Sequence, residues 1–234
     1  MKILTPQDIE SIYSNHVTVN YTDEYKVRYH PLPIERNNRK WRWEGKDFPR
    51  VISLFEFDRY VYKYDFKIDN LLLFNGVGDP EMEYLEGRVK SVHDYNYIDN
   101  KTKYDLHQLD LDRRDFDFVM FNQTLEHVYN PYLVLKNVYD HMKSGGYLYT
   151  NVPACNVPHS EPVHFFTGYT PMGLAATAFQ AGFKILEIGQ WGSEGYLHAL
   201  FSRNPGWADY RQFNNPGLNE MQNPVITWGL FKKL

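Results

Sequence analysis

The clearest hydrophobic pattern in the chain runs from Phe116 to Pro153. Phe116–Phe121 is a nearly continuous apolar run, which is typical of a parallel strand buried on both faces. Asn130-Pro131 then opens a segment with apolar residues at helical spacing, and Gly145 marks the expected end of that helix. A second apolar run, Tyr147–Val152, follows directly. The pattern predicts a strand, a helix and a second strand in one β–α–β unit.

The same alternation of short apolar runs and helical patterns extends along the chain on both sides of this unit. Alternation of this kind predicts an α/β fold in which helices cover both faces of a mostly parallel sheet. No internal repeat, low-complexity tract or linker divides the chain into separate units. Further strands are expected at Leu71–Phe74, Arg88–His93, Phe183–Ile188 and Val225–Phe231, and further helices at Pro80–Glu86 and between Thr170 and Gly182.

The N-terminal part of the chain is less regular, with two predicted helices. Residues 5–8 carry the signature of a helix start, and Ile9, Ile12 and Tyr13 mark one apolar face of a short helix. Phe48–Tyr62 returns to helical spacing. On this second helix, the positions expected on one apolar side are Val51, Leu54, Phe55 and Val61.

An aromatic and basic stretch around Trp41-Arg42-Trp43 lies between these two helices. Its composition suits a cap over a binding site. We therefore expect residues 1–66 to form a helical and aromatic cap segment that packs on a main domain of residues 67–234. The two parts together are expected to make one globular unit.

Composition and charge narrow the possible function classes. The 234 residues suffice for the core of one α/β domain. The net charge of −4 and the pI near 6.1, without a cluster of Lys and Arg, disfavour nucleic-acid binding. No apolar run reaches the roughly 18 residues of a membrane span, and the N-terminus lacks the apolar segment of a signal peptide. With Cys155 as the single cysteine, these features indicate a cytoplasmic protein without a membrane span.

Polar residues follow the predicted strands at the edge where open α/β sheets bind ligands. The turn Asn75–Asp79 contains two glycines directly after a buried strand, where glycine lets the backbone approach a ligand. A plain tight turn explains the same residues equally well. An asparagine and a glutamine occupy the corresponding position in the β–α–β unit. The expected ligand contacts at these two strand ends are Asn75, Gly76, Gly78, Asn122 and Gln123.

Carboxylates after the other strands suit a nucleoside. Asp94 follows the second predicted strand, a position from which a carboxylate accepts hydrogen bonds from both hydroxyls of a ribose. Asp99 competes for this role, and a solvated acid in a loop is the alternative reading of the position. Asp105, followed by Leu106, is placed to accept a hydrogen bond from an adenine amine. These residues extend the expected site toward a bound nucleoside.

Taken in order, the motifs resemble those of class I S-adenosylmethionine-dependent methyltransferases, of the type that acts in ubiquinone and menaquinone biosynthesis. Phe116–Pro153 is similar to that family's fourth strand, Leu-Glu-His-Val loop, helix and Lys-x-Gly-Gly turn. Tyr169–Leu174 and Gln180–Phe183 resemble its next helix and strand, and Asn223–Trp228 resembles its final strand. The likeness covers residues 69–190 and this tail.

The resemblance implies a Rossmann-like fold with a mostly parallel, seven-stranded sheet and an antiparallel last strand. It also implies S-adenosyl-L-methionine as the cofactor, which supplies an activated methyl group. Asp105-Leu106 sits at the family's adenine-side position. The residues expected above to contact a nucleoside would then bind this cofactor.

Two positions depart from the family pattern. Phe74 stands where the family has an acidic residue, and Pro80 replaces the usual third glycine. A carboxylate that would hold part of the cofactor is therefore missing. The departures keep a second hypothesis open, a methyltransferase-like domain without activity that serves as a binding or assembly module. Pro80 also counts against a nucleotide-binding dehydrogenase, whose fingerprint needs the third glycine.

Candidate catalytic residues lie in two segments. His127 belongs to the loop after the fourth family strand, and His159, Glu161 and His164 follow the fifth strand, where the family fold faces the same cleft. A histidine and a carboxylate in a polar loop suit a general base for a hydroxyl acceptor. Structural roles are the alternative for His127 and His164.

The resemblance also raises the question of a metal. Quinone-type relatives have a Glu-x-x-Glu-His pattern that resembles a magnesium site, and this chain has Gln123 in place of the first acid. Glu126 and His127 would be the remaining ligands. Because Mg²⁺ prefers hard oxygen ligands, the lost carboxylate weakens the case for Mg²⁺ at this position.

The side-chain composition bears on the methyl acceptor. Aromatic residues make up 17% of the chain, including 19 tyrosines, which suit ordinary packing and also ring-lined sugar sites. No amphipathic membrane-facing helix suited to a quinone is evident. We expect O-methylation of a sugar, glycan or other small polar hydroxyl acceptor. A phenol, quinone-type or amine acceptor is the alternative, and a homodimer stays open.

Overall fold

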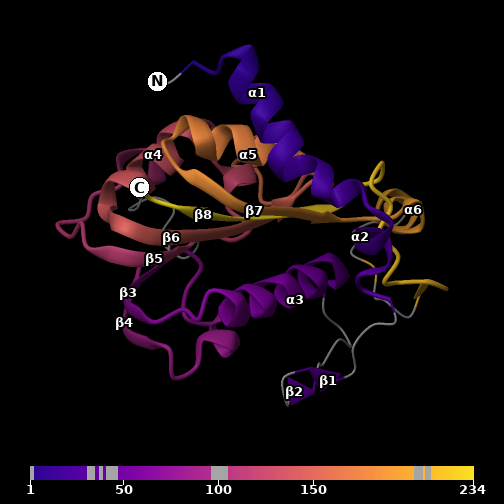
Figure 1. Ribbon diagram of the computed structural model, residues 1–234, viewed down its shortest axis with the longest axis horizontal. Coiled ribbons are helices and arrows are strands. Elements are labelled where there is room, and N and C mark those ends of the chain that lie inside the picture. The colour runs from indigo at the N-terminus through magenta and orange to yellow at the C-terminus, as the bar shows by residue number, and fades with distance from the viewer. Residues whose placement is uncertain are drawn as a thin grey trace.

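The computed structural model of the protein describes residues 3–30, 35–36, 39–40, 47–95, 105–202, 208 and 212–234. Its centre is a six-stranded sheet in the order β4-β3-β5-β6-β8-β7 (Figure 1). Neighbouring strands pair in parallel from β4 to β6, whereas β8 is antiparallel to both of its neighbours. The strands are β3 (Ile68–Leu73), β4 (Val89–Asp94), β5 (Phe116–Met120), β6 (Met142–Pro153), β7 (Lys184–Trp191) and β8 (Ile226–Lys232).

The α/β class and the antiparallel last strand are thereby confirmed. Seven strands were expected in this sheet, and the described residues contain six of them. Asp99, the competitor of Asp94, and the Trp41-Arg42-Trp43 stretch lie outside the described residues. A separate two-stranded pairing joins β1 (Glu35–Arg36) and β2 (Arg39–Lys40).

Helices cover both faces of the sheet, as Figure 1 shows. On one face lie α4 (Pro131–His141) and α5 (Pro171–Gln180), with α1 (Pro6–Ile12) packed beside α5. On the other face lies α3 (Phe48–Lys63). The remaining helices are α2 (Asp23–Val27) and α6 (Glu194–Ser202), and the shorter helical turns are η1 (Tyr13–Val17), η2 (Thr18–Tyr21), η3 (Pro80–Leu85), η4 (Leu106–Gln108) and η5 (Leu125–His127).

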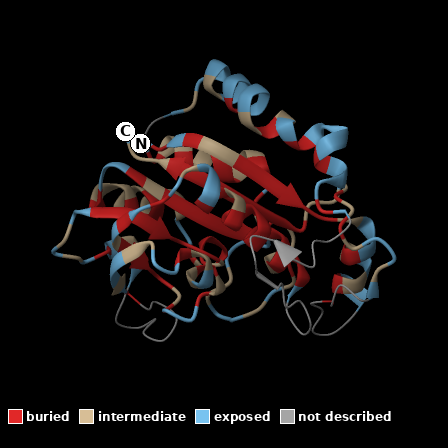
Figure 2. Ribbon diagram, turned by 60° about the horizontal axis from the view of Figure 1, so that its bottom comes forward, coloured by how far each residue is buried: buried red, intermediate tan, exposed pale blue. Residues whose placement is uncertain are grey.

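Strand β5 shows how the sheet separates two apolar cores. Its side chains alternate between the faces, with Val119 in the core under α4 and α5 and Phe118 and Met120 in the core under α3. All five residues of β5 are buried. The continuous apolar run in the sequence therefore follows from burial on both faces, and Figure 2 shows the strands as the buried layer of the molecule.

Helix α3 is buried more completely than its sequence indicated. One apolar side was expected, yet Ile52 and Phe57 are buried along with Val51 and Phe55. The N-terminal segment explains the difference, because Tyr29 stacks on Phe55 with ring centroids 6.5 Å apart. The helix is thus enclosed between the sheet and a second layer of chain.

Two local expectations were wrong. Helix α4 ends at His141, and Gly145 lies within β6, where its N–H donates to the carbonyl oxygen of Lys233 at 2.8 Å. The Lys233 ammonium donates to the carbonyls of Tyr139 and Met142, both at 2.8 Å, and so caps the helix end without a glycine.

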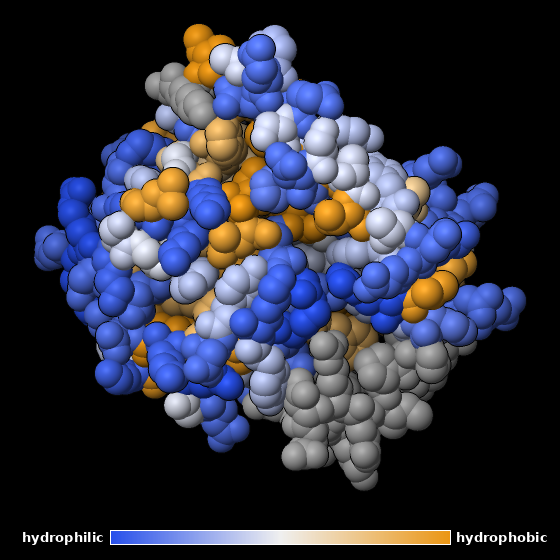
Figure 3. Space-filling model, in the orientation of Figure 1, coloured by the Kyte–Doolittle hydropathy of each residue, from blue (hydrophilic) through white to orange (hydrophobic). Residues whose placement is uncertain are grey.

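The expected apolar face of the first helix is the second error. Only Ile12 of that face is buried, while Ile9 is 46% and Tyr13 44% exposed. Figure 3 shows apolar side chains gathered over α5 and β7, beside α1. A groove of about 610 Å³ lies there, lined in part by Ile12, Phe179 and Ile185. It lies at the start of β7, on the sheet edge opposite to the strand ends that are expected to bind a ligand.

Among the described residues, no helix combines the length and the apolar character that crossing a membrane requires.

Candidate functional site

The ends of β4, β3 and β5 meet at one edge of the sheet. Leu73 pairs with Asp94 on one side and with Met120 on the other. Two residues beyond these strand ends, the Asn75 amide donates to the carbonyl oxygen of Asn122. The structure thus brings together the ligand-contact candidates that follow β3, β4 and β5.

The glycine turn after β3 is open toward solvent. Gly76 has a φ of 88°, a left-handed conformation that favours glycine, and its carbonyl accepts the N–H of Asp79 at 3.1 Å. A Cβ added at Gly78 would meet no atom within 4 Å. Phe74, which replaces the family's acidic residue, is buried. Its ring packs edge-on against that of Phe121, with the ring centroids 4.9 Å apart. The turn therefore offers backbone and open space to a ligand.

A charged cluster of Arg50, Asp79 and Glu81 lies directly behind this turn. The Arg50 guanidinium, from α3, binds Glu81 through two hydrogen bonds of 3.1 and 2.7 Å and also contacts the carboxylate of Asp79. Asn122 donates to Asp79 at 3.0 Å, and Asn151 donates to Glu81 at 2.8 Å. Both carboxylates are buried, so Arg50 supplies the charge that makes their burial tolerable.

The two carboxylates of this cluster share one cation, Arg50, and their pKa values are shifted in opposite directions. Burial and the neighbouring charge of Glu81 raise the pKa of Asp79 to about 8. Burial alone would raise the pKa of Glu81, but the charge and hydrogen bonds of Arg50 hold it below its ordinary value. At neutral pH the cluster therefore keeps Glu81 ionised and Asp79 protonated.

The nucleoside-side candidates lie at the outer end of the same edge. Asp94 ends β4 and is exposed. Asp105 is also exposed, and its Oδ1 accepts the backbone N–H of His107 at 2.9 Å and the Nδ1–H of the same ring at 2.8 Å. Leu106 is buried in the apolar core on one face of the sheet, as is Tyr95, which follows Asp94 in the chain. Of these candidates, Asp94 and Asp105 are the ones exposed to a ligand.

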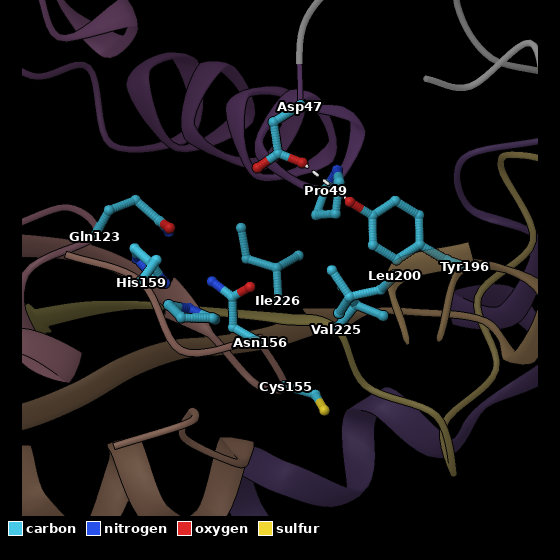
Figure 4. A pocket seen from close by; sticks show the side chains of 11 residues that line it. Asp47, Pro49, Gln123, Cys155, Asn156, His159, Tyr196, Leu200, Val225 and Ile226 are labelled. Carbon is cyan, nitrogen blue, oxygen red and sulfur yellow. Dashed lines mark hydrogen bonds between the residues drawn. The ribbon is translucent and has the colours of Figure 1, made fainter. Parts of the chain in front are cut away.

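A pocket lies on the other side of Asn122 and Gln123, between the ends of β5 and β6 and the helices α3 and α6 (Figure 4). Its volume is about 100 Å³. Polar side chains and a small apolar wall face each other across it. The lining residues that matter for chemistry are Asp47, Gln123, Asn156, His159 and Tyr196, and the apolar wall includes Leu200, Val225 and Ile226.

Gln123 stands between the two halves of the site in an uncommon backbone conformation. Its φ is 47°, in the left-handed region. Two hydrogen bonds to Asn151 hold it there, one from its N–H to the carbonyl at 2.7 Å and one from its side-chain amide at 2.8 Å. Such conformations persist where the surroundings enforce them, and they are frequent at functional sites.

Asp47 and Tyr196 form a pair inside the pocket. The Tyr196 hydroxyl donates to the Asp47 carboxylate at 3.1 Å, as the dashed line in Figure 4 marks. Although Asp47 keeps contact with solvent, surrounding protein atoms raise its pKa to about 6, against the opposing effects of the Tyr196 hydrogen bond and the charge of Arg50. A carboxylate with this pKa is mostly ionised at neutral pH and is a competent proton acceptor.

The histidines expected in the cleft gather at the edge of this pocket. One ring nitrogen of each of His127, His159 and His164 lies within 4.8 Å of the others. Glu161, the fourth candidate, is exposed on the loop between them. The loop is attached to η5, because the backbone N–H of Phe165 donates to the carbonyl oxygen of Glu126 at 2.9 Å.

The Mg²⁺ site considered at Glu126 and His127 does not match the donor set around it. Burial raises the pKa of Glu126 to about 7, and Gln123, in place of the first acid, uses its amide to bind Asn151. The nearest potential ligands are imidazole nitrogens rather than the oxygen atoms that Mg²⁺ prefers. The residues around Glu126 and His127 therefore do not fit Mg²⁺.

Sequence reasoning missed Asp47, Tyr196 and Asn156 in the pocket, and Arg50 and Glu81 behind the turn. Asn156 follows the end of β6, so the strand-end rule applied above would have found it. Asp47 precedes a proline-containing helix start, where the sequence suggests an ordinary cap, but its carboxylate makes no such bond. Tyr196 belongs to α6, which the sequence pattern did not predict.

Residues 73–212 match the family model described as a methyltransferase domain. The structure is similar to an S-adenosylmethionine-dependent methyltransferase from Mesorhizobium loti, with a TM-score of 0.51 and 12% identity over 82% of this chain and 100% of that chain. It is also similar to N-methyltransferase NodS from Bradyrhizobium japonicum in complex with S-adenosyl-L-homocysteine, with a TM-score of 0.51 and 12% identity over 84% of this chain and 93% of that chain. No curated protein matches the sequence.

At this level of identity the two similar structures establish the fold. The family follows from the sequence match, which spans more than half of the chain. The protein thus belongs to the methyltransferase-domain family, and it is an S-adenosylmethionine-dependent methyltransferase with a class I, Rossmann-like fold.

Proposed function

We propose that the protein methylates a hydroxyl group of a small polar acceptor, such as a sugar or the end of a glycan. The observation that carries this proposal is the pocket of Figure 4, in which a carboxylate and amide side chains line the space beside the strand ends. Such groups make hydrogen bonds to hydroxyls, and one of them is poised to accept a proton.

The cofactor is proposed to lie along the edge formed by the ends of β4, β3 and β5. The exposed carboxylates of Asp94 and Asp105 would hold the ribose and the adenine, and the open backbone at Gly78 leaves room for the amino-acid end. These features fit the cofactor. When bound, S-adenosylmethionine supplies a methyl group on a sulfonium, so the protein has to supply position and a base.

Asp47 is the proposed base. Its carboxylate would accept the proton of the acceptor hydroxyl as that oxygen takes the methyl group, and Tyr196 would keep the carboxylate oriented through its hydrogen bond. The pKa near 6 leaves most Asp47 side chains ionised at pH 7. His159, also on the pocket wall, would contact the acceptor from the opposite loop.

The size of the pocket limits what it can enclose. About 100 Å³ is well below the roughly 300–1,000 Å³ of sites that bury a whole drug-sized ligand. The pocket therefore suits the reacting end of an acceptor, with the remainder outside it. This supports a terminal sugar or a similar polyhydroxylated group.

Product analysis tests the proposal. Purified protein would be incubated with methyl-labelled S-adenosylmethionine and sets of sugars, glycans, phenols and amines. We expect label on the oxygen of a polyhydroxylated acceptor. Transfer confined to amines, or to phenols without a polar substituent, would contradict the proposed acceptor class while leaving the methyltransferase assignment intact.

A further inference from the structure

We propose that His127, His159 and His164 bind a divalent transition metal of the zinc class at the edge of the acceptor pocket. The three imidazoles come from η5 and from the loop after β6, and one nitrogen of each lies within 4.8 Å of the others. Their ring centroids are 4.6 to 5.6 Å apart. Three imidazole nitrogens are a different donor set from the carboxylates of the Mg²⁺ pattern. The proposed metal site does not depend on which acceptor is methylated.

Hydrogen bonds select the tautomer that a metal requires in two of the rings. The Nδ1–H of His127 donates to the carbonyl of Val163 at 2.8 Å, and the Nδ1–H of His159 donates to the carbonyl of Val157 at 3.0 Å. In each ring Nε2 is then the nitrogen with the lone pair. Metal-binding histidines commonly donate their second N–H to a backbone carbonyl in this way, which fixes both tautomer and orientation.

His164 provides independent support. Both of its ring nitrogens are buried, and neither has a hydrogen-bond partner among the described residues. Leaving a buried polar atom without a partner is unfavourable. A metal ion bound to one of these nitrogens would satisfy it, and the neighbouring rings offer the other ligands.

The chemistry of the site indicates which ion would bind. Imidazole nitrogens suit Zn²⁺ and its neighbours in the first transition series, whereas Mg²⁺ and Ca²⁺ require oxygen ligands. Zn–N bonds of about 2.0–2.1 Å place tetrahedral ligands about 3.3 Å apart, so the rings would rotate inward on binding. The buried carboxyl group of Glu126 lies 3.8 Å from His127 Nε2, beside the proposed ion.

Binding would join η5 to the loop after β6. Hydrogen bonds at Phe165 and Val163 already hold that loop against η5. Metal binding would therefore cost little additional conformational entropy. His159 also lines the acceptor pocket, and the ion would therefore lie in its wall. With three protein ligands, one coordination position would stay open, as in zinc sites that do chemistry.

The test uses the 234-residue chain without a histidine tag. After dialysis against Zn²⁺ and then against metal-free buffer, metal analysis is expected to find one ion per chain. Replacement with Co²⁺ is expected to give the intense visible absorption of a tetrahedral ion. Zn²⁺ at about 100 times its Kd is expected to raise Tm by about 5–10 °C.

Variants separate this site from adventitious binding. His164→Leu and His159→Gln are each expected to weaken Zn²⁺ binding by more than about 100-fold. This loss exceeds the roughly 10–100-fold that is typical when a residue that only hydrogen-bonds to a metal ligand is replaced. His198→Ala removes an exposed histidine on α6 and is expected to bind like wild type. Without metal, His164→Leu is expected to keep or raise Tm, because it removes unpaired buried nitrogens, and this shows that the variant folds.

Wild-type protein that retains no stoichiometric Zn²⁺ or Co²⁺ would overturn the proposal. Equal binding by wild type and His164→Leu would overturn it as well, since the ion would then lie elsewhere. Because these readouts do not use methyl transfer, they remain interpretable if the proposed acceptor class proves wrong.

Discussion

Arg50→Met is expected to lower the free energy of unfolding by about 3–5 kcal/mol, the cost of leaving buried charge without its partner. The side chains of Glu81 and Asp79 are 0% and 4% exposed, and Arg50 is the cation that both contact. Because the Glu81 side chain is fully buried, bulk solvent does not reach it to replace the guanidinium. Urea denaturation at pH 7 measures the change, and a loss below about 1 kcal/mol would show that Arg50 does not neutralise the cluster.

Asp79→Asn is the matched control for this prediction. The pKa of Asp79 is about 8 in the folded protein and 3.8 as the ordinary value. Between these values the folded state holds a proton that the unfolded state releases, so this group makes stability fall as pH rises from about 4 to 8. Asn mimics the protonated side chain, so the variant is expected to match wild-type stability near pH 4, to lack this part of the pH dependence, and to be the more stable of the two proteins at pH 7.

Asp47→Asn is expected to reduce kcat by about 10²–10⁴-fold, the usual contribution of a general base. The shape of the side chain is preserved, so binding of S-adenosylhomocysteine is expected to remain at the wild-type level. In wild type, activity is expected to rise with pH through about 6, because the base must lose its proton. That rise is expected to be absent in the variant.

Tyr196→Phe is the control for the role of Asp47. It removes the hydrogen bond that stabilises the ionised carboxylate, so the pKa of Asp47 is expected to increase. The acid limb of the pH–rate profile is then expected to shift to higher pH. The effect on kcat at pH 8 is expected to be small. An unchanged profile in both variants would exclude Asp47 as the base.

Local sequence signals predicted the central part of the fold. The apolar runs of β5 and β6 are buried on both faces, and Asn130 caps α4 by accepting the N–H of Leu133 at 3.1 Å. Thr170 caps α5 in the same way through Gly173. Where short-range chemistry and burial agree, the pattern defines the element.

Long-range contacts account for what the sequence did not reveal. Asp47 and Tyr196 are 149 positions apart, and neither has a local pattern that points to the other. The histidines of the β6 loop were expected to face the same cleft as His127, but their mutual approach depends on backbone bonds between that loop and η5. The prediction that helix α4 ends at Gly145 was wrong because Lys233, near the end of the sequence, caps the helix at His141 instead.

Calorimetric titration with S-adenosylhomocysteine tests most directly whether this chain uses the strand-end edge for its cofactor. We predict one site per chain, with affinity reduced by about 10-fold or more in Asp94→Ala, as loss of hydrogen bonds to a charged group implies, and unchanged in Asp47→Asn. Absence of binding at millimolar ligand, or equal binding by wild type and Asp94→Ala, would contradict the placement of the cofactor at the ends of β4, β3 and β5.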